Sequence, residues 1–310
     1  MVIKISNLVK RYGELIALDH FSLNVEDGEI FGLLGPNGSG KTTAINCMLS
    51  LLKYDKGQIE LFGKPMSPTA YDIKRNIGVI FQNVAVFEEL TVYENIDYFC
   101  GLYVKDKKER RRLVDEAIEF VSLNEFVKFY PKKLSGGLLR RLNIACGIAH
   151  KPKLILLDEP TVAVDPQSRN NILEGIKRLN EDGATILYTS HYMDEVEMLC
   201  DRIAIIDKGK TIAQGTKDEL KEMISLGETV SMSIDYMEDN IINEIKQLPK
   251  IISVEYKDEL LTVKSNKGAN NLVNIVDFLN KRSITPSLIH SELPTLNDVF
   301  LEITGKQLRD

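Results

Sequence analysis

Three groups of residues along this 310-residue chain have the types and the spacing that chemistry on phosphates requires. The first is residues 35–42, GPNGSGKT, which fit the pattern GxxxxGK(S/T) and follow an apolar run at residues 29–34. Glycines let backbone N–H groups fold around phosphate oxygens, the lysine reaches the β- and γ-phosphates, and the threonine hydroxyl binds Mg²⁺. The helical pattern that follows would point its N-terminus at the same anion. The segment therefore predicts a nucleotide site, with candidate residues Gly35, Pro36, Asn37, Gly38, Ser39, Gly40, Lys41, Thr42 and Thr43.

The second group is a pair of carboxylates, Asp158 and Glu159, which follow the apolar run LILL at residues 154–157. A buried strand that ends in Asp158 places a carboxylate at the carboxyl edge of the sheet, where nucleotides bind in doubly wound folds. Because Glu159 points elsewhere, the two carboxylates can have two roles. We expect Asp158 to hold Mg²⁺, directly or through water, and Glu159 to act as general base on the attacking water.

The third group is Ser135, Gly136 and Gly137, at the start of a helix predicted over residues 136–150. A hydroxyl and two glycines at a helix start form a second anion-receiving N-terminus. Alone, the group would be an ordinary helix cap with a flexible turn. Since the chain already has a complete phosphate loop, the group suggests contact with the phosphate of another molecule's nucleotide.

The order of these motifs resembles the ATP-binding cassette of ABC transporters over about residues 1–220. In chain order, the matching features are GPNGSGKTT, Gln82, LSGGL at residues 134–138, LILLDEP, a D-loop at residues 161–165 and His191. The resemblance implies an ATPase that uses Mg²⁺. It implies that Tyr12 stacks on adenine, that Gln82 touches Mg²⁺ and the attacking water, and that His191 donates to the γ-phosphate.

The resemblance also implies a composite site between two subunits. Ser135 and Gly137 would cap the γ-phosphate of ATP bound to the opposite subunit, and Asp165 would lie at the dimer interface. Two positions depart from the family pattern. Leu138 replaces the commonest residue, glutamine, a change that we expect the site to tolerate. Ala163 stands in the D-loop where glycine is usual and lacks glycine's freedom at positive φ, so we expect effects on the interface and the hydrolysis rate, not on ATP binding.

The elements that must position these residues begin with strands expected at residues 2–8, 16–24 and 29–34 and a helix at 42–52. Residues 68–150 look mainly helical, with helices at 68–75, 92–102, 107–121 and 136–150. Short apolar runs at 154–157, 184–188 and 203–206 then alternate with helical patterns, as in strands of a parallel sheet buried on both faces. A hairpin at 207–210 and a helix from 216 to 224 close this part. The resemblance implies an α/β P-loop NTPase cassette with a RecA-like core, a helical subdomain and an antiparallel β subdomain.

A change of pattern divides the chain into two expected domains. Residues 226–228, LGE, are the best linker candidate, so the ATP-binding domain would span 1–225, with its helical subdomain at about 84–150. In residues 226–310 we expect strands at 229–234, 251–256, 260–264 and 284–290. Helices are expected at 239–248, 269–281 and 296–303. This βαββαβ order with a terminal helix is that of a small ferredoxin-like α+β domain.

Composition excludes several other classes of protein. Hydrophobic residues make up 44% and charged residues 27%, as in an ordinary globular protein. The net charge of −6 disfavours a nucleic-acid partner, and no apolar run approaches the length of a membrane span. The four cysteines include no CxxC pair, which favours reduced thiols in the cytosol. A basic run at 105–112 is either a solvated helix face or a contact for anionic lipid headgroups or an acidic partner loop.

Residues 293–305, LPTLNDVFLEITG, resemble the end of the accessory domain in single-cassette exporter ATPases. Such ATPases pair with a separate permease of the ABC-2 type, often for drug or antibiotic efflux. The resemblance thus implies a homodimer bound to a permease at the cytoplasmic face of the membrane; an alternative role for the tail is a dimer-stabilising appendage. Two other functions stay open, an importer ATPase with a regulatory tail and a soluble ATPase acting on ribosomes or nucleic acid. The absence of sustained heptads between Lys41 and Ser135 disfavours the coiled-coil relatives that act on DNA.

Overall fold

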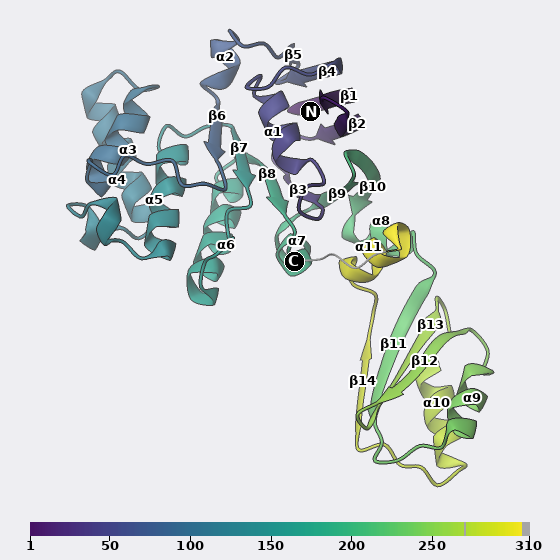
Figure 1. The fold of residues 1–310 in the computed structure, drawn as a ribbon. Helices are drawn as coiled ribbons and strands as arrows, with labels where there is room; N and C mark the ends of the chain where they lie inside the picture. Colours follow the sequence, from purple (N-terminus) through teal and green to yellow (C-terminus); the bar gives the residue numbers. More distant parts are fainter. Residues whose placement is uncertain (270, 306–310) are drawn as a thin grey trace. The chain divides into compact units, whose positions relative to one another are not determined.

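The computed structural model describes residues 1–269 and 271–305, which divide between Lys217 and Asp218 into two compact units (Figure 1). The boundary predicted from the sequence lies slightly later, between residues 225 and 226. Its second domain also included residues 306–310, which lie outside the described part. No helix in the described residues is both long and apolar enough to span a membrane.

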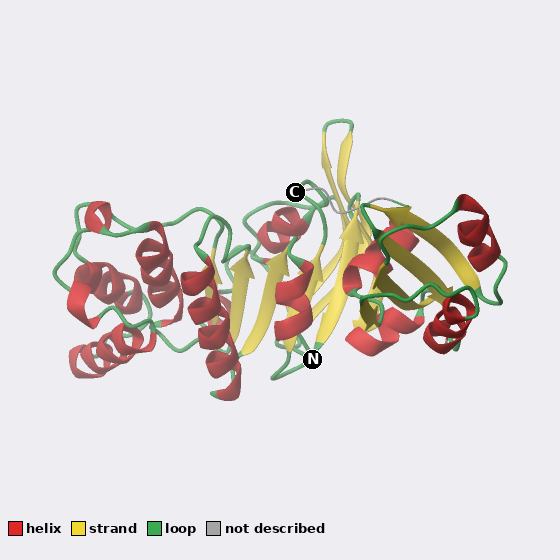
Figure 2. Cartoon of the chain, turned by 90° about the horizontal axis from the view of Figure 1, so that it is seen from below, coloured by secondary structure: helices red, strands yellow, loops and turns green. Residues whose placement is uncertain are grey.

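A six-stranded sheet forms the centre of the first unit, in the order β10-β9-β3-β8-β7-β6. Its strands are β3 (Ile30–Leu34), β6 (Ile77–Ile80), β7 (Leu154–Asp158), β8 (Thr185–Ser190), β9 (Arg202–Asp207) and β10 (Lys210–Thr216). All neighbours are parallel except β9 and β10, which form the predicted antiparallel hairpin. Strands β3, β7 and β8 are buried along their whole length, which confirms the prediction of a parallel sheet covered on both faces. Figure 2 shows helices packed along the strands.

Strand β6 corrects the prediction that residues 68–150 are mainly helical. It occupies the sheet edge beside β7, with Ile77 opposite Leu154 and Ile80 opposite Leu157. A run of four residues is too short to show its period in the sequence, and its pairing with β7 is a long-range contact. The expected helix at 68–75 is correspondingly reduced to α2 (Tyr71–Lys74).

An antiparallel sheet in the order β2-β1-β4-β5 accompanies the central sheet. Its strands are β1 (Ile3–Tyr12), β2 (Leu15–Val25), β4 (Lys56–Leu61) and β5 (Lys64–Pro65), of which the last two were not predicted. Buried residues of this sheet, such as Leu18 and Phe21, share one core with Phe31 of β3 and Ile45 of α1 (Lys41–Met48). That core fixes the phosphate loop between β3 and α1.

Three helices gather at one side of the first unit: α3 (Val92–Gly101), α4 (Lys107–Phe120) and α5 (Gly136–Ile148) (Figure 1). They occupy the region expected for the helical subdomain. The basic run at 105–112 lies at the start of α4, where Arg110 pairs with Asp97 at 2.8 Å and Arg112 pairs with Glu109 at 2.6 Å. These two arginines therefore belong to surface ion pairs, as expected for a solvated helix face. The remaining helices of this unit are α6 (Pro166–Glu181) and α7 (Met193–Leu199), with α8 (Lys217–Glu222) at the boundary.

The second unit has the expected order of strands and helices. It contains β11 (Leu226–Ser233), α9 (Asp239–Lys246), β12 (Ile251–Lys257), β13 (Leu260–Asn266), α10 (Asn271–Asn280), β14 (Leu288–Glu292) and α11 (Leu296–Thr304). The strands form an antiparallel sheet in the order β12-β13-β11-β14, and its apolar residues pack with α9 and α10 in a separate core. Residue 270, within the helix predicted at 269–281, lies outside the described residues.

Residues 226–228 are part of β11, so their assignment as a linker was wrong. Leu226 is buried and pairs with Asn266 of β13, and Glu228 accepts a hydrogen bond from Ser291 at 2.6 Å. A Cβ at Gly227 would lie 2.7 Å from the Asn266 carbonyl oxygen, so this glycine permits a close approach of two strands. The glycine thus reflects packing within the sheet, and not a flexible connection.

Candidate functional site

The loop between β3 and α1 has the backbone that its sequence predicts. Gly38 and Gly40 adopt φ values of 78° and 112°, which glycine alone adopts without strain. At Gly35 a Cβ would lie 2.3 Å from the carbonyl oxygen of Ile206, so the loop packs directly on β9. Ser39 has a buried hydroxyl that makes no hydrogen bond with the described residues. A glycine cradle that holds an unpaired hydroxyl fits a nucleotide's phosphate oxygens.

Lys41 is only 4% exposed and lies at the centre of the candidate site. Its Nζ donates to the carbonyl oxygens of Gly35 at 2.7 Å and Pro36 at 3.1 Å, and it forms an ion pair with Glu159 Oε1 at 3.1 Å. The ammonium is thereby held inside the loop, at the first turn of α1. This is the position from which a lysine contacts phosphate oxygens.

Asp158, at the end of β7, is held by two hydroxyl groups. Thr42 Oγ1 donates to Asp158 Oδ2 at 2.8 Å, and Thr189 Oγ1 donates to Oδ1 at 2.7 Å. The carboxylate and the Thr42 hydroxyl therefore lie together at the carboxyl edge of the sheet, as predicted. Oxygen donors of these two kinds suit Mg²⁺, which commonly binds one or two carboxylates together with phosphates. Thr189, on the neighbouring strand β8, was not identified from the sequence.

Glu159 brings three other predicted residues together. Gln82 Nε2 donates to Glu159 Oε2 at 3.3 Å, and His191 Nδ1 lies 3.4 Å from the same oxygen, without hydrogen-bond geometry. The carboxylate is 5% exposed and also contacts Lys41. Its backbone has a φ of 48°, and its N–H donates to Thr189 Oγ1 at 3.0 Å. A non-glycine residue in this conformation at a site is a strained position that its surroundings must hold.

Ser135, Gly137 and Asp165 form a second group of site residues within the same chain. Ser135 Oγ accepts from the Leu138 N–H at 3.3 Å and caps α5, while Asp165 accepts from Ser168 and caps α6. The N–H donors around Asp165 lower the pKa of its carboxyl group. A Cβ at Gly137 would lie 2.4 Å from Ser168 Oγ, so the two helix starts are in contact. The contacts described here are with α5 and α6, and do not involve the phosphate loop.

Tyr12 and Ala163 lie at the edges of this arrangement. Tyr12 ends β1 and is 47% exposed, with Lys10 Nζ 4.9 Å from its ring centroid. The ring is therefore accessible, as adenine stacking requires. Ala163 has a φ of 59°, so the D-loop does require the left-handed conformation that the sequence analysis associated with glycine.

Arg140, in α5, was missed because an arginine in a sequence is most often exposed. In the structure it is 3% exposed and donates to backbone carbonyls of the segments that contain Gln82 and Glu159. Burial lowers the pKa of its guanidinium group. Only the fold could identify this residue, because its partners are distant in the sequence.

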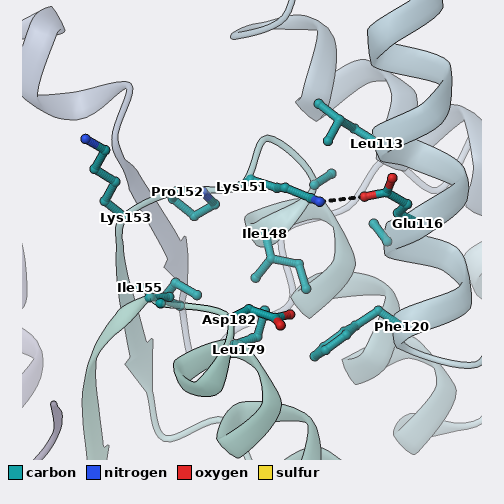
Figure 3. Close-up of a pocket in the computed structure, with 14 residues that line it drawn as sticks. Leu113, Glu116, Phe120, Ile148, Lys151, Pro152, Lys153, Ile155, Leu179 and Asp182 are labelled. Carbon is teal, nitrogen blue, oxygen red and sulfur yellow. Dashed lines mark ion pairs between the residues drawn. The ribbon is translucent and has the colours of Figure 1, made fainter. Parts of the chain in front are cut away.

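A cavity of about 510 Å³ lies elsewhere in the first unit (Figure 3). Phe120, Ile148 and Leu179 are among its mostly apolar lining residues, and Lys151 pairs with Glu116 at 2.6 Å beside them. The cavity reaches β7 near its first residues, whereas Asp158 ends that strand. It contains none of the predicted site residues.

Comparisons with known proteins identify the family of this chain. A family model described as ABC transporter matches residues 18–162. The linearmycin resistance ATP-binding protein LnrL of Bacillus subtilis is 36% identical, and the alignment covers 100% of both chains. The Nod factor export ATP-binding protein I of Ralstonia nicotianae is 32% identical over 100% of this chain and 95% of its own.

A solved structure supports the fold of the first unit. The dimeric ATP-binding cassette MJ0796, in a post-hydrolysis state bound to ADP and Pi, matches with a TM-score of 0.63 at 28% identity. The match covers 69% of this chain and 98% of that cassette. The chain has the phosphate loop and the paired carboxylates, and its relatives align with it over the whole length. It therefore belongs to the ATP-binding, ATP-hydrolysing proteins of the ABC transporter family.

Proposed function

We propose that ATP hydrolysis by this chain drives export of a drug- or antibiotic-like compound through a separate permease of the ABC-2 type. The observation that carries this proposal is similarity over the full length, second unit included, to one relative named for linearmycin resistance and another for Nod factor export. The proposed location is the cytoplasmic face of the membrane, where the permease holds the chain.

Within one subunit, the phosphate loop binds the triphosphate and Tyr12 stacks on adenine. Thr42, Asp158 and Gln82 would hold Mg²⁺, which would supply positive charge that offsets the charge of the phosphates. Glu159 accepts the proton of the attacking water. Gln82 and His191, both within 3.4 Å of the Glu159 carboxylate, orient this water and the γ-phosphate.

The site is completed by a second copy of the chain. Gly137 and Asp165 contact Ser168 at the start of α6, whereas Ser135 caps its own helix and Gly136 has open space beside it. The open N-terminus of α5, with Ser135 and Gly136, is therefore the part of this group that would receive the partner's γ-phosphate. The dimeric state of the MJ0796 cassette supports this arrangement. ATP bound at the interface then joins the two subunits until it is hydrolysed.

An exposed aromatic group near Gln82 is the proposed contact for the permease. Phe87 lies 5.0 Å from Tyr98, measured between ring centroids, and both rings are more than 40% exposed. Exposed apolar groups of this kind mark interaction surfaces. Only four residues lie between Gln82 and Phe87 in the chain, so a partner bound here contacts the segment that carries Gln82.

The first test is the variant Glu159→Gln, which keeps the size of the side chain and removes the base. We expect ATP binding to be retained and hydrolysis to fall by about 10²–10⁴-fold. The uncleaved γ-phosphate should also trap a dimer, visible by size-exclusion chromatography with ATP. Hydrolysis within a few-fold of wild type would contradict the role of Glu159.

The second test identifies the membrane partner. The full-length chain is affinity-tagged and extracted from membranes in mild detergent, and the co-purifying proteins are identified by mass spectrometry. An exporter predicts an integral membrane protein with about six spans and no solute-binding protein. Replacing Phe87 and Tyr98 with serine should reduce its recovery, whereas ATP hydrolysis by the purified chain should persist. Recovery of a solute-binding protein would favour an importer instead.

A further inference from the structure

Arg140 uses its whole guanidinium group to bind backbone carbonyls. Its Nε donates to the Pro160 oxygen at 2.6 Å, and its two terminal nitrogens donate to four further carbonyls: Phe81 and Gln82 at 2.8 Å each, Glu159 at 2.8 Å and Asp158 at 3.5 Å. Arginine has five N–H donors, so the side chain is fully satisfied. Its five partners come from two segments, the residues around Gln82 and the turn after β7.

Burying a guanidinium group in this way costs free energy of hydration. A buried guanidinium gives up its hydration, and here the hydrogen bonds that replace it end on neutral carbonyls. Removing the guanidinium alone would leave five backbone carbonyls without their donor, so Arg140 also stabilises the fold. The identity of these partners indicates a further role.

The partners connect three parts of the proposed site. Arg140 is in α5, whose N-cap is Ser135, five residues earlier on the same rigid helix. Its partners flank the carboxylate of Glu159 and the amide of Gln82, which contact each other at 3.3 Å. Asn143, one turn further along α5, accepts from the Ala85 N–H at 3.1 Å, so two residues of the helix hold the Gln82 segment.

We infer that Arg140 is a positioning residue, which ties the start of the partner-facing helix α5 to Glu159 and Gln82 of its own chain. Glu159 has a φ of 48°, a conformation that needs support from its neighbours. Two hydrogen bonds provide it: the Glu159 N–H donates to Thr189 Oγ1, and Arg140 donates to the Glu159 carbonyl oxygen. A shift of α5 therefore moves the carbonyls on either side of the base. This inference rests on the proposed role of Glu159.

The test compares Arg140→Met with wild type in ATP binding and hydrolysis. Methionine fills much of the volume but forms none of the five hydrogen bonds. We expect kcat to fall by about 10²-fold, the effect of a small misplacement of a catalytic group, while ATP affinity changes by less than about threefold. The thermal melting temperature of each variant is measured in parallel.

The combination with Glu159→Gln separates positioning from a structural role. If Arg140 acts through Glu159, then Arg140→Met should change the residual hydrolysis of Glu159→Gln by less than about twofold, because coupled residues are not additive. The double variant should also still form the ATP-trapped dimer. If Glu159→Gln alone hydrolyses ATP normally, the proposed role of Glu159 has failed, and with it the basis of this inference.

Arg141→Met is the matched control. Arg141 is in the same helix and donates to the carbonyls of Val121 and Ser122, away from the site, so hydrolysis should stay within about twofold of wild type. Arg140→Lys keeps a charge but reaches fewer carbonyls, and it should recover part of the lost kcat. This variant decides the question if Arg140→Met does not fold. Equal kcat in Arg140→Met and wild type, or an additive loss in the double variant, would overturn the inference.

Discussion

Lys41 shows how one side chain can serve several parts of a site. Its ammonium contacts two loop carbonyls and the Glu159 carboxylate, all within 3.1 Å. Lys41→Ala should weaken ATP binding by about 1.5–3 kcal/mol, the value of a charge-assisted contact to phosphate oxygens. A direct titration with ATP measures this change. Lys64→Ala, which breaks an exposed ion pair with Asp72, is the control and should leave the affinity as it is. Unchanged affinity in Lys41→Ala would contradict the phosphate-loop assignment.

The backbone conformation of Ala163 leads to a prediction about the free energy of unfolding. Its φ of 59° costs a residue with a Cβ about 1–2 kcal/mol, which glycine would not incur. Glycine also gives the unfolded chain about 0.4–1 kcal/mol of extra entropy, so Ala163→Gly should leave stability unchanged or raise it by up to about 1 kcal/mol. Ala117→Gly, within α4, should instead lower it by about 1 kcal/mol or more. Denaturant unfolding compares the two; equal losses would contradict strain at Ala163.

Most residues of the proposed site could be predicted from the sequence. In the structure Lys41, Gln82 and His191 lie against Glu159, and Thr42 contacts Asp158. The phosphate loop and the acidic pair have local patterns of their own, whereas Gln82 and His191 were identified through the resemblance to the ABC cassette. Thr189 and Arg140 have no such pattern. Thr189 becomes a partner of Asp158 only through the register of β7 and β8, in which the two residues face each other. Arg140 is recruited only when α5 packs against two distant segments. Long-range pairing, unlike a motif, cannot be derived from one sequence.

At the scale of single elements, His150 holds the end of α5 to β6. Its ring stacks on Tyr103 with centroids 3.9 Å apart, and its Nε2 lies 3.3 Å from the Ile77 carbonyl oxygen. Burial lowers the pKa of His150 to about 4, from an ordinary value of 6.5. The His150 imidazole binds a proton more readily in the unfolded chain than in the folded chain. The stability that neutral His150 contributes is therefore complete above about pH 6.5 and is lost as the pH falls toward 4.

The corresponding prediction is a change in the pH profile of stability. Between pH 7 and pH 4.5 this histidine should account for about 2 kcal/mol of the fall in the free energy of unfolding. His150→Asn should therefore show a shallower profile than wild type in denaturant titrations at each pH. Parallel profiles for wild type and His150→Asn would rule out this role for His150.

The elements also show which local signals were reliable. Strands β7, β8 and β9 were predicted from apolar runs, because a strand buried on both faces has few polar residues. Strand β6 has the same character but only four residues, next to a region with helical periodicity. In β11, Gly227 suggested a break, although a close approach to β13 explains it. A glycine can mark either a break in the chain or a close approach of two strands, and only the position of the neighbouring strand shows which of the two applies.

At the scale of the whole molecule, the proposed ATP site is complete only when a second copy contributes its Ser135 segment. Ser135→Arg places a long cation at the start of α5, where the proposed partner's γ-phosphate binds. The purified variant should bind ATP like wild type, since its own phosphate loop is intact, yet it should neither dimerise with ATP nor hydrolyse it. Light scattering and phosphate release measure these two properties.

The control for this variant is Ser135→Ala, which removes the cap of α5 without blocking its N-terminus. Its loss should be limited to about 0.5–2 kcal/mol of stability, the usual value of a helix cap, with dimerisation retained. Hydrolysis at the wild-type rate by Ser135→Arg would show that residues 134–138 are an ordinary helix start, and the composite site would have to be abandoned.

The contact between Gly137 and Ser168 affects how inactivating mutations in this gene are interpreted. Any side chain at position 137 would push the starts of α5 and α6 apart within a single chain, because a Cβ there lies 2.4 Å from Ser168 Oγ. A loss-of-function allele at this glycine therefore cannot by itself reveal a fault between subunits. At Gly136 a Cβ meets nothing within 4 Å. An inactive allele at position 136 is consequently the informative one, since it alters the surface offered to a second copy and leaves the packing of its own chain intact.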